Sequence, residues 1–101
     1  MKITLKTQGN IYNLMRKCGY HPEGKDEKTG QLIFARRIGA SDYPRFHAYL
    51  KIDDVSRETI EINLHLDQKK PVYKGAPAHG AEYSGEAIER EAERIKQTAG
   101  L

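Results

Sequence analysis

Cysteine and tryptophan are scarce in this sequence: Cys18 is its only cysteine, and it has no tryptophan. A single cysteine excludes an intrachain disulfide and a zinc site built from several cysteines. Cys18 falls on the apolar face of an expected helix, so we interpret it as a small core residue and not as a nucleophile.

Long apolar runs and the common nucleotide-binding motifs are also missing. No stretch approaches the roughly 18 apolar residues of a membrane span, and the first residues lack the apolar stretch of a signal peptide, so we expect a cytoplasmic protein. The sequence has no phosphate loop, no Rossmann glycine pattern and no nucleophile elbow. Its 101 residues fit one domain, residues 1–101, and an apolar content of 38% suffices for a single layer of core.

Positive charge is in modest excess and is unevenly distributed. The formal net charge is +3, but residues 1–80 hold 14 Lys/Arg against 9 Asp/Glu, whereas residues 81–101 hold 3 against 5. A basic body with an acidic last segment permits nucleic-acid binding without requiring it.

Apolar periodicity predicts two helices. The first has Asn10 as its N-cap and Gly19 just after its end, and the second has Ser84 as its N-cap. The apolar stripe of the first helix is Ile11, Leu14, Met15 and Cys18, and that of the second is Ile88, Ala92, Ile95 and Ala99.

Alternating polar and apolar residues predict strands over residues 2–6, 31–38, 44–52 and 58–67. Within residues 31–38, Leu32, Phe34 and Ile38 share one face. Residues 21–30 and 68–83 are polar and contain Gly and Pro, which favours loops. The predicted order is β-α-β-β-β-α, an α+β fold in which helices cover one face of an antiparallel sheet and leave the other face open.

The two longest strands should pair as a hairpin across a turn at residues 53–57. Because side chains alternate along a strand, one set points inward and the other set points outward. The inward set is Phe46, Ala48, Leu50 and Ile52 with Ile60, Ile62, Leu64 and Leu66; the outward set includes Arg45, His47, Tyr49 and Lys51. His47 then lies opposite either Asn63 or His65, and in both cases the two imidazoles are neighbours.

This outward face is the candidate functional site. His47 and His65 are the candidate catalytic residues, because two imidazoles can accept and donate the protons that RNA cleavage by its own 2′-hydroxyl requires. Cationic and aromatic neighbours would hold phosphate and stack on a base. The candidate RNA-binding residues are Arg37, Arg45, Tyr49 and Lys51 and, in a basic loop, Lys69, Lys70 and Lys74.

Three other interpretations stand beside this one. Exposed strands often carry Arg, His, Tyr and Lys for solubility and strand propensity. The open face also suits a protein-interaction module without catalysis. Finally, zinc accepts His and carboxylate ligands, although the spacing here matches no strong motif, and no cofactor is predicted. The candidate metal ligands are His47, His65, Asp67, His79 and Glu82.

Residues 10–101 resemble the HicA-type messenger-RNA interferase toxins, which have a double-stranded-RNA-binding-domain-like fold. The resemblance is carried by a helix followed by Gly19-Tyr20, by Phe46-His47-Ala48 in a middle strand, by Leu64-His65-Leu66 in the next strand, and by a helix that opens at Gly85 and ends in Lys96-Gln97-Thr98-Ala99-Gly100-Leu101. It implies a ribonuclease that uses His47 and has a small antitoxin as its partner. The chain departs from the family where Tyr43-Pro44-Arg45-Phe46-His47 replaces the usual Gly-Ser-His-His run, and it has an additional N-terminal strand and an inserted loop at residues 68–83.

Overall fold

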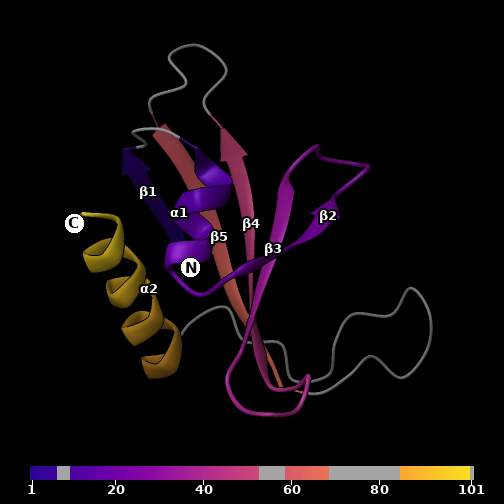
Figure 1. The fold of residues 1–101 in the computed structure, drawn as a ribbon, viewed down its shortest axis with the longest axis vertical. Helices are drawn as coiled ribbons and strands as arrows, with labels where there is room; N and C mark the ends of the chain where they lie inside the picture. The colour runs from indigo at the N-terminus through magenta and orange to yellow at the C-terminus, as the bar shows by residue number, and fades with distance from the viewer. Residues whose placement is uncertain (7–9, 53–58, 69–84, 101) are drawn as a thin grey trace.

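A computed structural model of the protein describes residues 1–6, 10–52, 59–68 and 85–100. Five antiparallel strands form one sheet in the order β1-β5-β4-β3-β2, with two helices packed against it (Figure 1). The elements are β1 (Lys2–Lys6), α1 (Ile11–Lys17), β2 (His21–Lys25), β3 (Leu32–Arg37), β4 (Arg45–Ile52), β5 (Thr59–Asp67) and α2 (Glu86–Ala99). The predicted α+β class with an antiparallel sheet is confirmed.

Strand β2 is the element that the sequence pattern fails to predict. A loop was expected over residues 21–30, but His21–Lys25 pair with β3, so the order is β-α-β-β-β-β-α. Pro22 and Gly24 prevent the sequence from showing a strand pattern here, because both residues are depleted in regular strands. They are tolerated because β2 lies at the sheet edge and its register shifts at a bulge between them.

The hydrophobic core lies between one face of the sheet and the two helices. Met15 and Cys18 near α1, and Ile88 and Ile95 on α2, belong to one cluster with the inward side chains of the sheet. Cys18 is fully buried, as predicted. The buried residues from the strands are Ile3, Phe34, Phe46, Ala48, Leu50, Ile60, Ile62, Leu64 and Leu66.

One core prediction is wrong, because Ile38 does not join the inward face. The chain leaves β3 after Arg37, and Ile38 is 49% exposed. Arg36 takes the last inward position of β3, where it lies opposite Phe46 and its guanidinium stands over the Phe46 ring, 5.5 Å from the centroid.

A polar cluster around Glu91 is built into the helix-bearing side of the sheet. The Glu91 carboxylate accepts hydrogen bonds from the Tyr20 hydroxyl at 2.6 Å, from Arg36 at 2.9 and 3.0 Å, and from Arg94 at 2.7 Å. Burial alone would raise the pKa of Glu91, but the hydrogen bonds from Arg94, Arg36 and Tyr20 outweigh it and lower this pKa. The cluster connects α2 with β3 and with the segment after α1.

The N-terminal boundary of α1 agrees with the prediction, whereas that of α2 does not. Asn10 caps α1, because its side chain accepts hydrogen bonds from the backbone N–H groups of Tyr12 and Asn13. Helix α2 has Gly85 at its N-cap, without a side-chain hydrogen bond, so the prediction of Ser84 as the N-cap is wrong by one residue. The predicted cap Ser84, the turn at 53–57 and nearly all of the loop at 68–83 lie outside the described residues. Among the residues that are described, no helix is long and apolar enough to cross a membrane.

Candidate functional site

The helix-free face of the sheet brings the two candidate histidines together. His47 lies directly opposite His65 in the β4–β5 register, and their ring centroids are 5.3 Å apart. The predicted proximity is therefore confirmed, and of the two alternatives His65, not Asn63, is the cross-strand partner. The Tyr49 ring stacks on His65 with a centroid distance of 5.3 Å.

The side chains of these two histidines are less exposed than we predict for residues on a sheet face that no helix covers. The side chains of His47 and His65 are only 10% and 12% exposed. His47 sits on the central strand β4, so strands flank it on both sides, and its ring lies among other large side chains. The expectation of two solvent-exposed imidazoles is therefore wrong, and the site is a partly buried polar layer.

Asp67 connects the two imidazoles. One of its carboxylate oxygens is hydrogen-bonded to His47 Nδ1, and the other lies 3.3 Å from His65 Nε2. Strand geometry positions it, because Asp67 follows His65 by two residues and therefore shares its face. Burial alone would raise the pKa of Asp67, but hydrogen bonds with His47 and His65 lower it below its ordinary range. Asp67 is therefore ionised at neutral pH.

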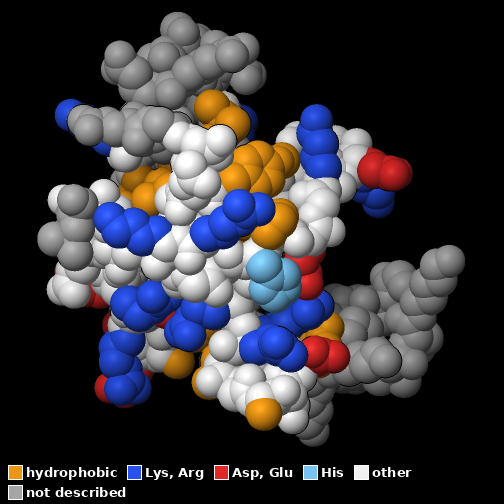
Figure 2. Space-filling view, viewed as in Figure 1, with side chains coloured by type: hydrophobic (Ala, Val, Ile, Leu, Met, Phe, Trp, Pro, Cys, Tyr) orange, Lys and Arg blue, Asp and Glu red, His pale blue; other side chains and the backbone are white. Residues whose placement is uncertain are grey.

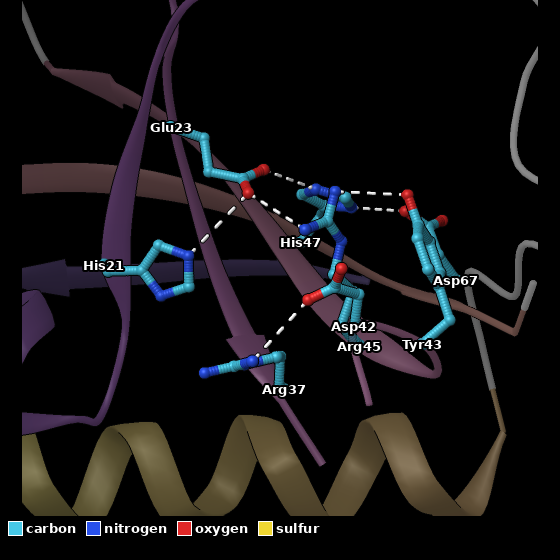
Figure 3. Close-up of polar contacts among 8 residues, drawn as sticks. All are labelled: His21, Glu23, Arg37, Asp42, Tyr43, Arg45, His47 and Asp67. Atoms are coloured by element: carbon cyan, nitrogen blue, oxygen red, sulfur yellow. Dashed lines mark hydrogen bonds and ion pairs between the residues drawn. The ribbon is translucent and has the colours of Figure 1, made fainter. Parts of the chain in front are cut away.

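Glu23 holds the opposite side of the His47 ring. Its Oε1 lies 2.9 Å from His47 Nε2, and its Oε2 accepts a hydrogen bond from Arg45 Nη1 at 3.0 Å (Figure 3). Glu23 lies at the bulge of β2, and Ala35 of β3 is the register partner of both His21 and His47. The small side chain of Ala35 leaves room for a carboxylate from β2 to reach the ring on β4.

Both ring nitrogens of His47 thus face carboxylates. Burial alone would lower the pKa of His47, but the hydrogen bonds with Asp67 and Glu23 outweigh burial and raise this pKa above its ordinary value of 6.5. With two acceptors in place, both nitrogens act as donors, which is the arrangement of the protonated imidazolium. The site therefore favours a charged, oriented His47.

The other predicted RNA-binding residues are only partly gathered here. Arg45 adjoins the histidines through Glu23, whereas Arg37 is half-exposed and lies 3.5 Å from Asp42. Lys51 is exposed farther along β4, opposite Glu61. The predicted lysines Lys69, Lys70 and Lys74 and the predicted metal ligands His79 and Glu82 lie outside the described residues.

Positive charge does not by itself single out the helix-free face. Figure 2 shows Lys and Arg side chains dispersed over the side of the molecule on which the helices lie. Charge is therefore weaker evidence for a nucleic-acid surface than the arrangement of the histidines.

Sequence reasoning missed Glu23 and considered Asp67 only as a metal ligand. The alternation of β5 contained the signal for Asp67, because residues 65 and 67 must share a face. No comparable signal existed for Glu23, since Pro22 and Gly24 hide its strand and only the sheet order brings it near His47.

Three residues of the site also form a set of metal-ligand donors. One donor atom each from His47, His65 and Asp67 can be chosen so that all three lie within 4.8 Å of one another. Zinc takes His and carboxylate ligands in such sets. Glu23, on the far nitrogen of His47, occupies the position of the carboxylate that often orients a metal-bound histidine.

Comparisons with protein-family models, with curated proteins and with solved structures found no match to this chain. Its function must therefore be inferred from the arrangement of the side chains themselves.

Proposed function

We propose that this protein is an RNA-binding domain that cleaves its bound strand, with His47 and His65 as the catalytic pair. The observation that carries the proposal is their cross-strand pairing, with ring centroids 5.3 Å apart. A proton donor and a proton acceptor must both reach one reacting phosphate, which requires such closeness. Within this proposal the chain is a relative of the HicA-type toxins, with a double-stranded-RNA-binding-domain-like fold and a small antitoxin as its partner.

The proposed reaction is an internal transesterification. The 2′-hydroxyl oxygen attacks the adjacent phosphorus and the bond to the 5′-oxygen breaks, which leaves a 2′,3′-cyclic phosphate and a 5′-hydroxyl. His65 accepts the proton of the 2′-hydroxyl, and His47 gives a proton to the departing 5′-oxygen. This assignment follows from Asp67, whose hydrogen bond with His47 Nδ1 raises the pKa of His47 and leaves Nε2 as the nitrogen that donates the proton.

Cleavage of a short single-stranded RNA tests the catalytic part of the proposal. His47→Ala and His65→Ala should each lower the rate by about 10²–10⁴-fold, because each removes one proton-transfer group. Gln97→Ala is the control, since Gln97 is exposed on α2, which packs against the other side of the sheet; its rate should stay within about threefold of the wild type. Cleavage that survives both His47→Ala and His65→Ala would exclude the proposed chemistry.

RNA binding is tested separately with a 2′-O-methyl oligomer, which has no 2′-hydroxyl and cannot be cleaved in this way. Combined Arg45→Ala and Lys51→Ala substitutions should weaken binding and make it less sensitive to salt. The logarithmic salt slope should become shallower by roughly 0.7 for each phosphate that the variant no longer neutralises. An unchanged affinity and slope would instead favour a surface that binds protein.

A second candidate function is transition-metal binding, which the convergence of donors from His47, His65 and Asp67 favours. Protein purified without chelators should then contain about one zinc per chain, and Asp67→Asn should lose it. A zinc content below about a tenth of an equivalent in the wild type would exclude this candidate.

A further inference from the structure

We infer that the Glu23 carboxylate occupies the position of an RNA phosphate group, so that the edge strand β2 closes an anion-binding site formed by Arg45 and His47. The inference rests on the proposed function, because it identifies the phosphate subsite of that surface. It also gives Glu23 a role as an internal competitor of the substrate.

The contacts of Glu23 are those that a bound phosphate would make. Its Oε1 lies 2.9 Å from His47 Nε2 and its Oε2 lies 3.0 Å from Arg45 Nη1. The same Oε2 also lies 3.7 Å from His21 Nε2 (Figure 3). Carboxylate and phosphate oxygens accept the same charge-assisted hydrogen bonds from arginine and histidine. A phosphate in this position would also lie next to the nitrogen from which His47 must donate its proton.

The two cations are held in position by groups other than Glu23. The Arg45 guanidinium stands over the Tyr43 ring, 4.7 Å from its centroid, and donates to the Tyr43 hydroxyl at 3.2 Å. His47 is fixed at its other nitrogen by Asp67. Both cations would therefore keep their orientation when Glu23 moves away, which is what a preformed anion site requires.

Arg45 also retains hydrogen-bonding capacity that Glu23 does not use. Among the described residues, its Nε is a buried nitrogen without a hydrogen-bond acceptor. A phosphate offers more acceptor oxygens than a carboxylate, and leaving a buried donor unpaired is costly. This unpaired nitrogen therefore favours a ligand richer in oxygen over the carboxylate that is present.

Glu23 can leave without disturbing the core. Strand β2 forms one edge of the sheet, pairs only with β3 among the described strands, and consists of exposed residues. The bulge places Gly24 at a φ of +124°, a conformation that glycine adopts readily and other residues rarely do. Rotation of one side chain, or a shift of this edge, would open the site.

Phosphate affinity of Glu23 variants tests the inference without reference to cleavage. Inorganic phosphate and the 2′-O-methyl RNA oligomer serve as probes, and binding is followed by nuclear magnetic resonance titration at fixed pH and salt. Glu23→Ala should bind both probes at least about tenfold more tightly than the wild type, because it removes a competing negative charge at contact distance. Glu23→Gln, which keeps the side-chain size, is a second variant for which we expect a smaller gain.

The matched control is Glu61→Ala, which changes the net charge equally. Glu61 lies on the same face opposite Lys51, four residues along β4 from His47 and hence roughly 13 Å away. Screening at physiological salt should keep its effect on the binding of inorganic phosphate below about threefold, and the control is read with this probe because Lys51 is itself a proposed RNA contact. Adding Arg45→Ala to Glu23→Ala should abolish the gain, because it removes one of the two cations.

The outcomes separate this inference from the proposed function. Tighter phosphate binding in Glu23→Ala without RNA cleavage by any variant would support the anion site and contradict the ribonuclease. Equal phosphate affinities for folded Glu23→Ala, Glu23→Gln and Glu61→Ala would overturn the inference, even if the wild type cleaves RNA. Tighter phosphate binding without tighter RNA binding would overturn the assignment of the subsite to an RNA phosphate.

Discussion

His47 and Ala35 show how two neighbouring residues define the site at the scale of single side chains. His47 supplies a ring whose two nitrogens face Asp67 and Glu23, and Ala35 is the adjacent residue on β3. Ala35 is completely buried although it lies on the helix-free face. The small side chain of Ala35 thus lies on the strand across which Glu23 reaches His47.

Ala35→Leu should separate Glu23 from His47 and overpack this face. We expect the free energy of unfolding to fall by about 1–3 kcal/mol, because added methylenes in a packed site force neighbouring side chains aside. Urea denaturation followed by circular dichroism measures this change. Ala40→Leu, at an exposed position between β3 and β4, should change the stability by less than about 0.5 kcal/mol; equal effects of the two substitutions would show that Ala35 is not tightly packed.

At the scale of elements, the Glu91 cluster fastens α2 to the rest of the fold. Helix α2 has a narrow apolar stripe, and its buried side chains include Glu91 among Ile88, Ala92 and Ile95. The hydrogen bonds of Glu91 to Arg36 on β3 and to Tyr20 cross between elements, whereas its bonds to Arg94 lie within the helix. The hydrogen bonds of Glu91 thus add to the apolar packing of α2, which the small side chain of Ala92 leaves weak.

Glu91→Gln should lower the free energy of unfolding by about 2–3 kcal/mol, because Arg36 and Arg94 lose the charge that compensates their partial burial. This loss is smaller than that of a fully buried pair, since both arginines keep some contact with solvent. The control Glu93→Gln makes the same charge change at an exposed position of α2, so an effect below about 0.5 kcal/mol is expected there. Comparable losses in the two variants would contradict the role given to Glu91.

The stability difference between the wild type and Glu91→Gln should depend on pH. The folded-state pKa of Glu91 lies below its ordinary value of 4.5, so its contribution is complete above that value and is lost as the pH falls through the folded-state pKa. Denaturation at about pH 7 should therefore show a larger difference than at about pH 3.5. Titration of Asp67 cancels in this comparison because both proteins contain it, and a difference that grows in acid would contradict the lowered pKa of Glu91.

At the scale of the whole molecule, the sheet divides into a buried centre and an exposed edge. Strands β4 and β5 lie inside the sheet order and supply most of the core residues that come from the strands, whereas β2 lies at an edge and is exposed throughout. The site spans this boundary, because His47, His65 and Asp67 lie on the inner strands and Glu23 lies on the edge.

Amide hydrogen exchange should reproduce this division. Backbone amides of β4 and β5 should exchange most slowly, near the limit of global unfolding, and those of β2 should exchange faster by at least about tenfold, because edge strands open locally. Mass spectrometry of exchanged peptides from residues 21–25 and 45–52 provides the comparison. Equal protection of the two segments would mean that Glu23 is held as rigidly as His47, which would weaken the inference that it yields to phosphate.

The sequence by itself determined the elements with strong periodicity and the proximity of the two histidines. Alternation in residues 44–52 and 58–67 predicted both strands, their inward sets and the neighbourhood of His47 and His65, because strand geometry allows only two faces. The helical spacing of Met15 and Cys18, and of Ile88 and Ile95, likewise predicted the buried faces of both helices. These are local consequences of backbone geometry, and they need no knowledge of distant contacts.

Only the tertiary structure decided the partners of that pair. The sheet order brings Glu23 from β2 to His47 across Ala35, although a bulge, a proline and a glycine hide its strand from any periodic signal. The same assembly turns Arg36 inward to meet Glu91, fifty-five residues away along the chain. Such contacts depend on which strands become neighbours, and this is decided by the packing of the whole sheet against the helices, not by the residues on either side of Glu23.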